Sequence, residues 1–375
     1  MANRNLSNAK RAKNDEFYTQ YSDIQKEIEA YLEFNPNVFR DKVVYCNCDD
    51  PFESNFFRYF VLNFRRLGLK QLITTSYKPS PVANTQLKLL GDDKTLTKSK
   101  GRPKVTANKF IINEVHDIDG DGEFNLKDVA QQLKENKNNE WTPLVGDGDF
   151  RSHESIELLK QSDIVVTNPP FSLFREYISQ LVDYDKKFLI IGNLNAIKYS
   201  SIFPLIKHNK IWLGNNSKVN GGAMFFEIPE EIANLEQVRE IRESKSGRKI
   251  YITRVQGVRW FTNLEHGRRH QPLPQMTKAE IIKFVTKKPF EKYDNYDAID
   301  VSLVKNIPSD YKGMMGVPIS FLDKYSPKQF EIIDLLNRYT LLDTQKTNED
   351  VRTRHSHTCN VNGKPVFSRI VIKHN

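Results

Sequence analysis

The sequence contains few cysteines and no long apolar run. Its 375 residues include three cysteines, which argues against a disulfide framework and predicts a reducing, cytoplasmic location. No stretch approaches the roughly 20 apolar residues that cross a bilayer, so we expect no membrane partner. The first residues lack the apolar segment of a signal peptide. Hydrophobic residues still make up 38% of the chain, which is enough for a sizeable core, and the length of 375 residues predicts two or three domains.

Basic residues outnumber acidic ones. The formal net charge is +9 and the pI is near 9.1, which fits a nucleic acid partner, although a solvated basic surface gives the same composition. Residues 1–14 contain no acid and form an N-terminal arm suited to a DNA backbone or groove. The cations of this arm are Arg4, Lys10, Arg11 and Lys13. A disordered terminus without a role explains the arm equally well.

The most specific feature is an apolar run at 163–167 that ends in Asn168-Pro169-Pro170-Phe171. The amino group of an aromatic ring is a poor nucleophile, and two acceptors that hold its N–H bonds help the nitrogen turn toward a methyl donor. The Asn168 side-chain oxygen and the Pro169 carbonyl are two such acceptors on a backbone that proline stiffens. Phe171 offers a face for a planar base. A plain turn after a strand is the alternative, and the amphipathic helix expected from Leu173 favours a site.

The periodicity of apolar residues predicts an α/β fold. A buried strand at 42–48, a helix with Phe56, Phe60 and Phe64 on one face, and a strand at 71–75 form a βαβ unit and predict a parallel sheet. A polar, Lys-rich insertion spans 78–145. The sheet then resumes in four further strands, with helices expected at 24–32, 171–182 and 200–207. These strands are expected at 163–167, 187–192, 210–213 and 223–228.

The βα alternation stops near residue 230. The segment 239–292 contains fourteen Lys or Arg residues against five Glu residues, interleaved with aromatic and polar side chains, as groove contact and phosphate positioning require. We therefore expect a catalytic domain at 15–230 and a smaller, basic recognition region at 231–375, closed by a hairpin at Asn362-Gly363. The DNA contacts expected here are Arg259, Arg268 and Arg269. Lys100-Gly101-Arg102-Pro103 resembles an AT-hook core, which adds Lys100 and Arg102.

The turn after the first strand, Asp49-Asp50-Pro51, occupies the place where a Rossmann-like sheet binds a nucleoside cofactor. It lacks the glycines that cradle a dinucleotide pyrophosphate. S-adenosylmethionine carries no phosphate, so this absence weighs against NAD more than against the methyl donor.

A second turn, 146–150, precedes the Asn-Pro-Pro-Phe segment by about twenty residues. Asp149 is suited to accept a hydrogen bond from the adenine amino group of the cofactor, and Phe150 to stack on its ring. A plain glycine turn is an equal alternative.

Two metal patterns are weaker. Residues 117–128 match a calcium loop, but a strand rather than a helix precedes them, and a tight acidic turn before a helix explains them without metal. His355, His357 and Cys359 alternate, yet their spacing is not that of a usual zinc site. Cys46 and Cys48 lie in the first strand and are expected to pack in the core. We expect no metal.

Together these segments resemble the EcoRI-type adenine-specific DNA methyltransferases. The resemblance covers most of the chain in the same order. It rests on residues 15–21, on 43–51 with 54–57, on 168–171, on 190–193 and on 260–264.

The resemblance implies a Rossmann-like methyltransferase sheet that uses S-adenosylmethionine to methylate N6 of a flipped adenine in double-stranded DNA, at a short specific sequence. It implies a catalytic turn of Asn168, Pro169, Pro170 and Phe171. The cofactor contacts that it implies are Phe17, Tyr18, Thr19, Cys48, Asp49, Asp50, Pro51, Asp149 and Phe150. We expect a monomer. Methylation of cytosine N4, an RNA base or a protein glutamine, and a non-catalytic DNA-binding protein on this fold, are the alternatives.

Overall fold

The structure is a computed structural model, which describes residues 18–48, 54–77, 107–118, 124–135, 138–215, 223–228, 238–243, 249–285, 290–336 and 359–375. The chain forms two compact units. Unit 1 comprises residues 1–193 and 216–264, and unit 2 comprises residues 194–215 and 265–375. Unit 1 therefore includes residues beyond 230, and unit 2 includes residues before it.

The centre of unit 1 is a parallel sheet, as the sequence predicts. Strand β2 (Val43–Cys46) pairs in parallel with β3 (Gln71–Thr75) and with β6 (Ile164–Thr167), and β6 pairs in parallel with β7 (Lys187–Asn193). All four residues of β2 and of β6 are buried. Burial on both faces is typical of parallel strands that helices cover on each side.

Antiparallel strands extend the parallel centre at both ends. Strand β4 (Asn108–Ile112) pairs with β3, β5 (Glu140–Pro143) pairs with β4, and β12 (Val258–Thr262) pairs with β7. The resulting order is β5-β4-β3-β2-β6-β7-β12. The region expected to be a polar insertion thus contributes two strands to the sheet, together with helix α5 (Leu126–Glu135).

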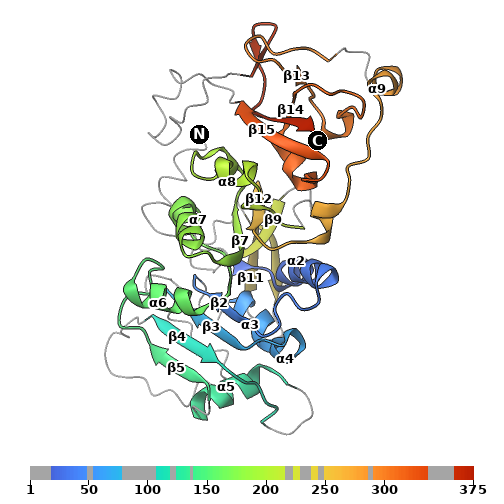
Figure 1. The fold of residues 1–375 in the computed structure, drawn as a ribbon. Helices are drawn as coiled ribbons and strands as arrows, with labels where there is room; N and C mark the ends of the chain where they lie inside the picture. The colour runs from blue at the N-terminus through green and yellow to red at the C-terminus, as the bar shows by residue number, and fades with distance from the viewer. Residues whose placement is uncertain are drawn as a thin grey trace. The chain divides into compact units, whose positions relative to one another are not determined.

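Helices cover both faces of this sheet (Figure 1). Helices α2 (Tyr21–Phe34), α3 (Asn55–Leu62) and α4 (Phe64–Leu67) lie on one face, and α6 (His153–Gln161) and α7 (Phe174–Asp183) lie on the other. Neighbouring side chains of strand β12 contact different helix layers. The ring centroids of Trp260 and of Phe56 in α3 are 6.0 Å apart, and those of Phe261 and of Phe174 in α7 are 5.0 Å apart. Neighbouring strand residues point to opposite faces, so β12 packs against both layers.

A second sheet in unit 1 corrects one expectation. Strand β9 (Ala223–Ile228) was expected to continue the main sheet, but it pairs antiparallel with β1 (Tyr18–Thr19) and with β11 (Lys249–Gln256). Strand β10 (Val238–Glu243) completes the order β1-β9-β11-β10. The place beside β7 is taken by β12, whose pairing partner lies far away in the sequence.

Unit 2 is a small mixed α/β unit. Its sheet has the order β13 (Ile299–Asp300), β14 (Met315–Pro318), β18 (Arg369–His374) and β15 (Phe330–Leu336). The expected hairpin is present, since β16 (Asn360–Val361) pairs with β17 (Lys364–Pro365) across Asn362 and Gly363, whose φ angles are 50° and 70°. Two positive φ angles are typical of a type I′ turn.

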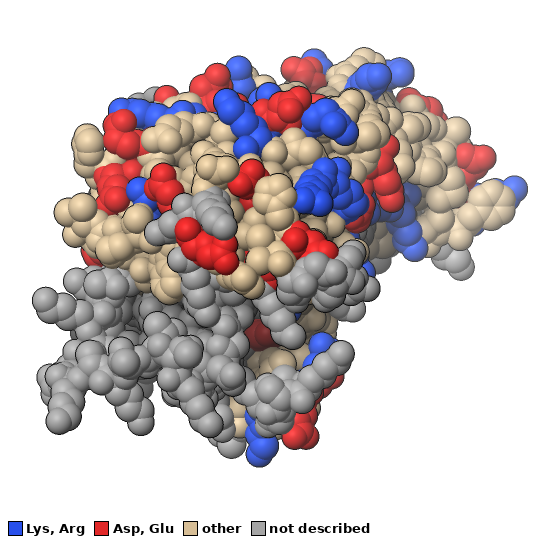
Figure 2. Space-filling view, turned by 90° about the horizontal axis from the view of Figure 1, so that it is seen from below, with Lys and Arg blue, Asp and Glu red and all other residues tan. Residues whose placement is uncertain are grey.

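The remaining elements of unit 2 are short. They are η2 (Leu194–Lys198), α8 (Phe203–Lys207), β8 (Trp212–Leu213), η5 (Gly267–His270), α9 (Lys278–Phe284), η6 (Val304–Asn306) and η7 (Ile319–Lys324). Among the residues that the structure describes, no helix is long and apolar enough to span a membrane. On the face drawn in Figure 2, Lys and Arg are interspersed with Asp and Glu over the described surface.

Candidate active site

The Asn-Pro-Pro-Phe turn lies at the carboxyl end of a central strand. Strand β6 ends at Thr167, a short 3-10 helix η1 (Phe171–Leu173) follows, and α7 begins at Phe174. The Asn168 side-chain oxygen is buried, and Phe171 is partly exposed while it packs against the core. The Pro170 carbonyl accepts a hydrogen bond from Leu173 N at 3.0 Å, which closes the turn. Strand, turn and helix follow one another as the sequence predicts.

The start of α3 is joined to the N-terminal strand β1. Ser54 caps α3 by accepting from the backbone N of Phe56 at 3.1 Å and of Phe57 at 3.4 Å. The side chain of Asn55 donates to the Thr19 carbonyl at 2.8 Å. Buried Thr19 therefore lies against the helix that begins directly after the expected cofactor turn.

The structure describes these cofactor segments in part. Cys48 is partly exposed, and Tyr18 lies in β1, where its backbone pairs with β9. Four further expected contacts lie outside the described residues, and their roles stay predictions. They are Phe17, Asp49, Asp50 and Pro51.

The turn at 146–150 requires a glycine at its centre. Gly148 has a φ angle of 79°, and a Cβ atom there would lie 2.0 Å from the carbonyl oxygen of Ser76. Ser76 directly follows β3, so the turn presses against the carboxyl end of the sheet. A left-handed φ and a backbone contact this close both exclude side chains. The glycine therefore sets where Asp149 and Phe150 lie.

Phe150 is buried against the helix that follows the Asn-Pro-Pro-Phe turn. Its side chain is 5% exposed, and its ring lies edge-on to the Tyr177 ring at 5.0 Å. The Phe150 carbonyl accepts from the Gln180 side chain at 3.1 Å. Tyr177 and Gln180 belong to α7, so α7 joins the 146–150 turn to the 168–171 turn.

Asn47 and Tyr177 form a buried pair that sequence reasoning missed. Asn47 precedes Cys48, and its side-chain oxygen accepts a hydrogen bond from the Tyr177 hydroxyl. Burial raises the pKa of Tyr177 well above its ordinary value, so the hydroxyl remains a donor. The end of β2 is thereby fixed to α7. A polar residue inside an otherwise apolar strand end was the only sequence signal for it.

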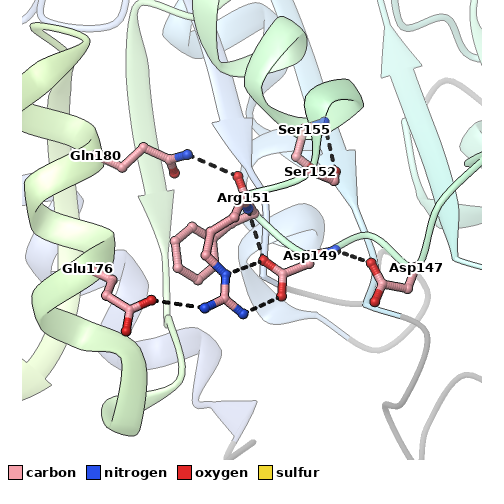
Figure 3. Close-up of polar contacts among 8 residues, drawn as sticks. Asp147, Asp149, Arg151, Ser152, Ser155, Glu176 and Gln180 are labelled. Carbon is pink, nitrogen blue, oxygen red and sulfur yellow. Dashed lines mark hydrogen bonds and ion pairs between the residues drawn. The ribbon is translucent and has the colours of Figure 1, made fainter.

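Arg151 also escaped the sequence reasoning. Figure 3 shows its guanidinium group between Asp149 and Glu176, with ion-pair distances of 2.7 Å and 2.9 Å. Hydrogen bonds to Asp149 are the largest cause of the raised pKa of Arg151. A local sequence signal that could have indicated this pair is the opposite charge of Asp149 and Arg151, which are two residues apart.

The structure describes the two possible metal-binding segments, 117–128 and 355–359, only in part. The Asp128 carboxylate, in the first turn of α5, accepts from Ile118 N and from Asn125 N, both at 2.8 Å. Residues 119–123, His355 and His357 lie outside the described residues. Among the described part of the chain, no three His, Cys, Asp or Glu side chains are placed to hold a metal ion. Cys46 is buried, as expected for a packing residue, whereas Cys48 is partly exposed; Cys359 is buried.

Two arginines expected at DNA are buried. Arg259 is 6% exposed and donates to the Val258 carbonyl at 2.9 Å. Arg269 is 5% exposed, and its guanidinium lies 3.8 Å from the centroid of the Trp212 ring. Both side chains therefore contribute to packing in this structure, whereas Arg268 is partly exposed. Arg4, Lys10, Arg11, Lys13, Lys100 and Arg102 lie outside the described residues, and DNA contact by all nine stays a prediction.

An α/β fold with a mixed sheet and an Asn-Pro-Pro-Phe turn at a strand end is consistent with a methyltransferase fold. The model of the family described as "Adenine-specific methyltransferase EcoRI" matches residues 5–375. The chain therefore belongs to this family, which confirms the resemblance inferred from the sequence.

Individual relatives match over nearly their full length. The type II methyltransferase M.EcoRI of Escherichia coli is 43% identical over 371 residues, which cover 99% of this chain and 96% of the relative. The type II methyltransferase M.MpnI of Mycoplasma pneumoniae is 40% identical, with 98% and 97% covered. M.MgeORF184P of Mycoplasma genitalium is 37% identical, with 98% of each chain covered. No solved structure gives a significant match.

Proposed function

We propose that this adenine-specific methyltransferase transfers a methyl group from S-adenosylmethionine to N6 of an adenine in double-stranded DNA, at a short specific sequence. The observation that carries this proposal is the position of the Asn168–Phe171 turn at the carboxyl end of β6, directly before α7. Ligands of open α/β sheets bind beyond the carboxyl ends of the strands. Phe150 and Asn47, the residue before Cys48, are hydrogen-bonded to α7, and Thr19 is hydrogen-bonded to Asn55 at the start of α3.

The turn provides hydrogen-bond acceptors and no strong base. The Asn168 side-chain oxygen and the Pro169 carbonyl would accept the two N6 hydrogens, while Phe171 would stack on the base, with a second stacking role for Tyr18. Held in this way, the amino nitrogen directs its lone pair toward the methyl donor. Catalysis then consists of positioning and exclusion of water. A target adenine inside a duplex stack is out of reach, so it must be flipped into the site.

The residues present fit a cofactor that has an adenine ring and lacks phosphates. Gly148 lets the 146–150 turn approach the sheet and places an acidic side chain beside an aromatic one. Asp149 would accept the adenine amino group, and Phe150 would flank the ring. Thr19 and Cys48 with the neighbouring residues of their segments would hold the rest of the molecule. S-adenosylmethionine, when bound, supplies the activated methyl group.

The remaining parts of the proposal concern DNA. Residues 231–375 would recognise the duplex, and the basic arm at 1–14 would contact its backbone or groove. Phosphate contacts would fix the register, and contacts to base edges would select the sequence. Arg268, which is partly exposed, is a better candidate for these contacts than the buried Arg259 and Arg269.

The variant Asn168→Ala tests the proposal. We expect it to abolish methyl transfer to a mixed-sequence duplex while DNA affinity, measured by fluorescence anisotropy, stays within about threefold of wild type. Asn35→Ala, at an exposed position after α2, is the matched control and should keep full activity. Near-normal turnover by Asn168→Ala would show that this side chain does not hold the reacting amine.

A further inference from the structure

One arginine connects the two turns of the candidate active site. The Arg151 Nε atom donates to Asp149 Oδ1 at 2.9 Å, and Nη2 donates to Asp149 Oδ2 at 2.7 Å. The backbone N of Arg151 also donates to Oδ1, at 2.9 Å. Both carboxylate oxygens are therefore held by a planar, two-pronged donor, and the carboxylate cannot rotate without breaking these bonds.

The same guanidinium reaches the helix that follows the Asn168–Phe171 turn. Its Nη1 atom donates to Glu176 Oε2 at 2.9 Å, in the first turn of α7 (Figure 3). It also lies 5.2 Å from the centroid of the Phe150 ring. Three contacts to three different groups leave the guanidinium little freedom, so it acts as a fixed point for the Asp149 carboxylate.

The exposed fractions of the three side chains indicate whether this bridge serves stability or orientation. The Asp149 side chain is 19% exposed, whereas those of Arg151 and Glu176 are 50% and 57% exposed. An ion pair at such a surface contributes little to the stability of a fold. Orientation of a partly buried carboxylate, in contrast, decides which ligand groups it can accept. The guanidinium fork is suited to this task, because the point charge of lysine cannot hold both oxygens in one plane.

We propose that Arg151 is a positioning residue of the cofactor site, which fixes the Asp149 carboxylate so that it accepts the amino group of the cofactor's adenine ring. Arg151 thereby sets the preference for adenine over hypoxanthine, whose ring carries a carbonyl oxygen in place of that amino group. This inference rests on the proposed function, because it assumes that the turn at 146–150 faces the adenine ring. A carboxylate rejects the carbonyl oxygen, since both groups are acceptors.

The test compares two ligands on three proteins. Isothermal titration calorimetry measures the affinity of wild type, Arg151→Lys and Glu176→Gln for S-adenosylhomocysteine and for its hypoxanthine counterpart, S-inosylhomocysteine. We expect wild type to prefer the adenine ligand by roughly ten- to a hundredfold, the range for a hydrogen bond to a charged group. Arg151→Lys should reduce this preference to within about threefold. Glu176→Gln removes only the charge of the α7 side chain that contacts Arg151, and it should keep the wild-type preference for the adenine ligand.

The outcomes separate a positioning role from a structural one. A structural role predicts that Arg151→Lys weakens both ligands by the same factor, and that result would overturn the inference. Unchanged preference in Arg151→Lys would overturn it as well. If wild type methylates DNA but binds both ligands equally, the proposed function stands and the inference falls. If wild type binds neither ligand and does not methylate DNA, the proposed function itself fails.

Discussion

Gly148 offers a prediction whose magnitude comes from two separable causes. In Gly148→Ala, the left-handed φ of 79° costs about 1–2 kcal/mol. The new Cβ atom would also lie 2.0 Å from the Ser76 carbonyl oxygen, which belongs to the backbone and cannot rotate away. The shift that relieves this contact causes a further loss of about 1–3 kcal/mol, the range for an overpacked site. We therefore expect a loss of about 2–5 kcal/mol in the free energy of unfolding.

Two other glycines provide matched controls. Gly257 has a φ of 72° with nothing within 4 Å of an added Cβ, so Gly257→Ala should show the backbone cost alone, about 1–2 kcal/mol. Gly146 has neither a left-handed φ nor a close neighbour, so Gly146→Ala should change stability by less than about 0.5 kcal/mol. Urea unfolding followed by tryptophan fluorescence measures all three.

The shift of the 146–150 turn in Gly148→Ala should also affect ligand binding at the candidate site. Calorimetry with S-adenosylhomocysteine should show weaker binding in Gly148→Ala than in Gly257→Ala, because the shift moves Asp149 and Phe150. Equal stability and equal affinity of Gly148→Ala and Gly146→Ala would refute the account of this turn.

Three further predictions concern packing, capping and pH. Ser54→Ala should lose about 1 kcal/mol of stability in a urea titration, because two backbone N–H groups of α3 lose their acceptor. Gly192→Ala should lower the midpoint of the same titration, because an added Cβ would lie 2.3 Å from the Phe174 ring. Burial lowers the pKa of His266 to about 4 from 6.5, so the unfolded state binds a proton first as the pH falls. Stability should decrease by about 3 kcal/mol between pH 6.5 and pH 4, and His266→Gln should remove this part of the pH dependence.

The sequence predicts the parts of the fold whose signals are local. Strand β2, helix α3 and strand β3 follow one another along the chain, and their parallel pairing follows from this connection. The Asn362-Gly363 hairpin has a turn signal that needs no distant partner. The Asn168–Phe171 turn is found for the same reason, since a strand, two prolines and an amphipathic helix are adjacent.

Pairing between distant segments has no such signal. Strand β12 pairs with β7, and β9, expected in the same sheet, pairs with β1 and β11 instead. Antiparallel partners that lie far apart in the sequence cannot be recognised from the periodicity of either one. The contact of Gly148 with Ser76 is hidden for the same reason. The contacts of Arg151 and Tyr177 depend on side-chain directions at the start of α7, which appear only when the sheet and the helix are assembled.

The most direct test of the central claim is the identity of the methylated base. Mixed-sequence duplex DNA is incubated with the purified protein and S-adenosylmethionine that carries a deuterated methyl group, and the nucleosides are then analysed by mass spectrometry. The account predicts deuterated N6-methyladenine with wild type and none with Asn168→Ala. Deuterated N4-methylcytosine, or no labelled base despite tight binding of DNA, would contradict it.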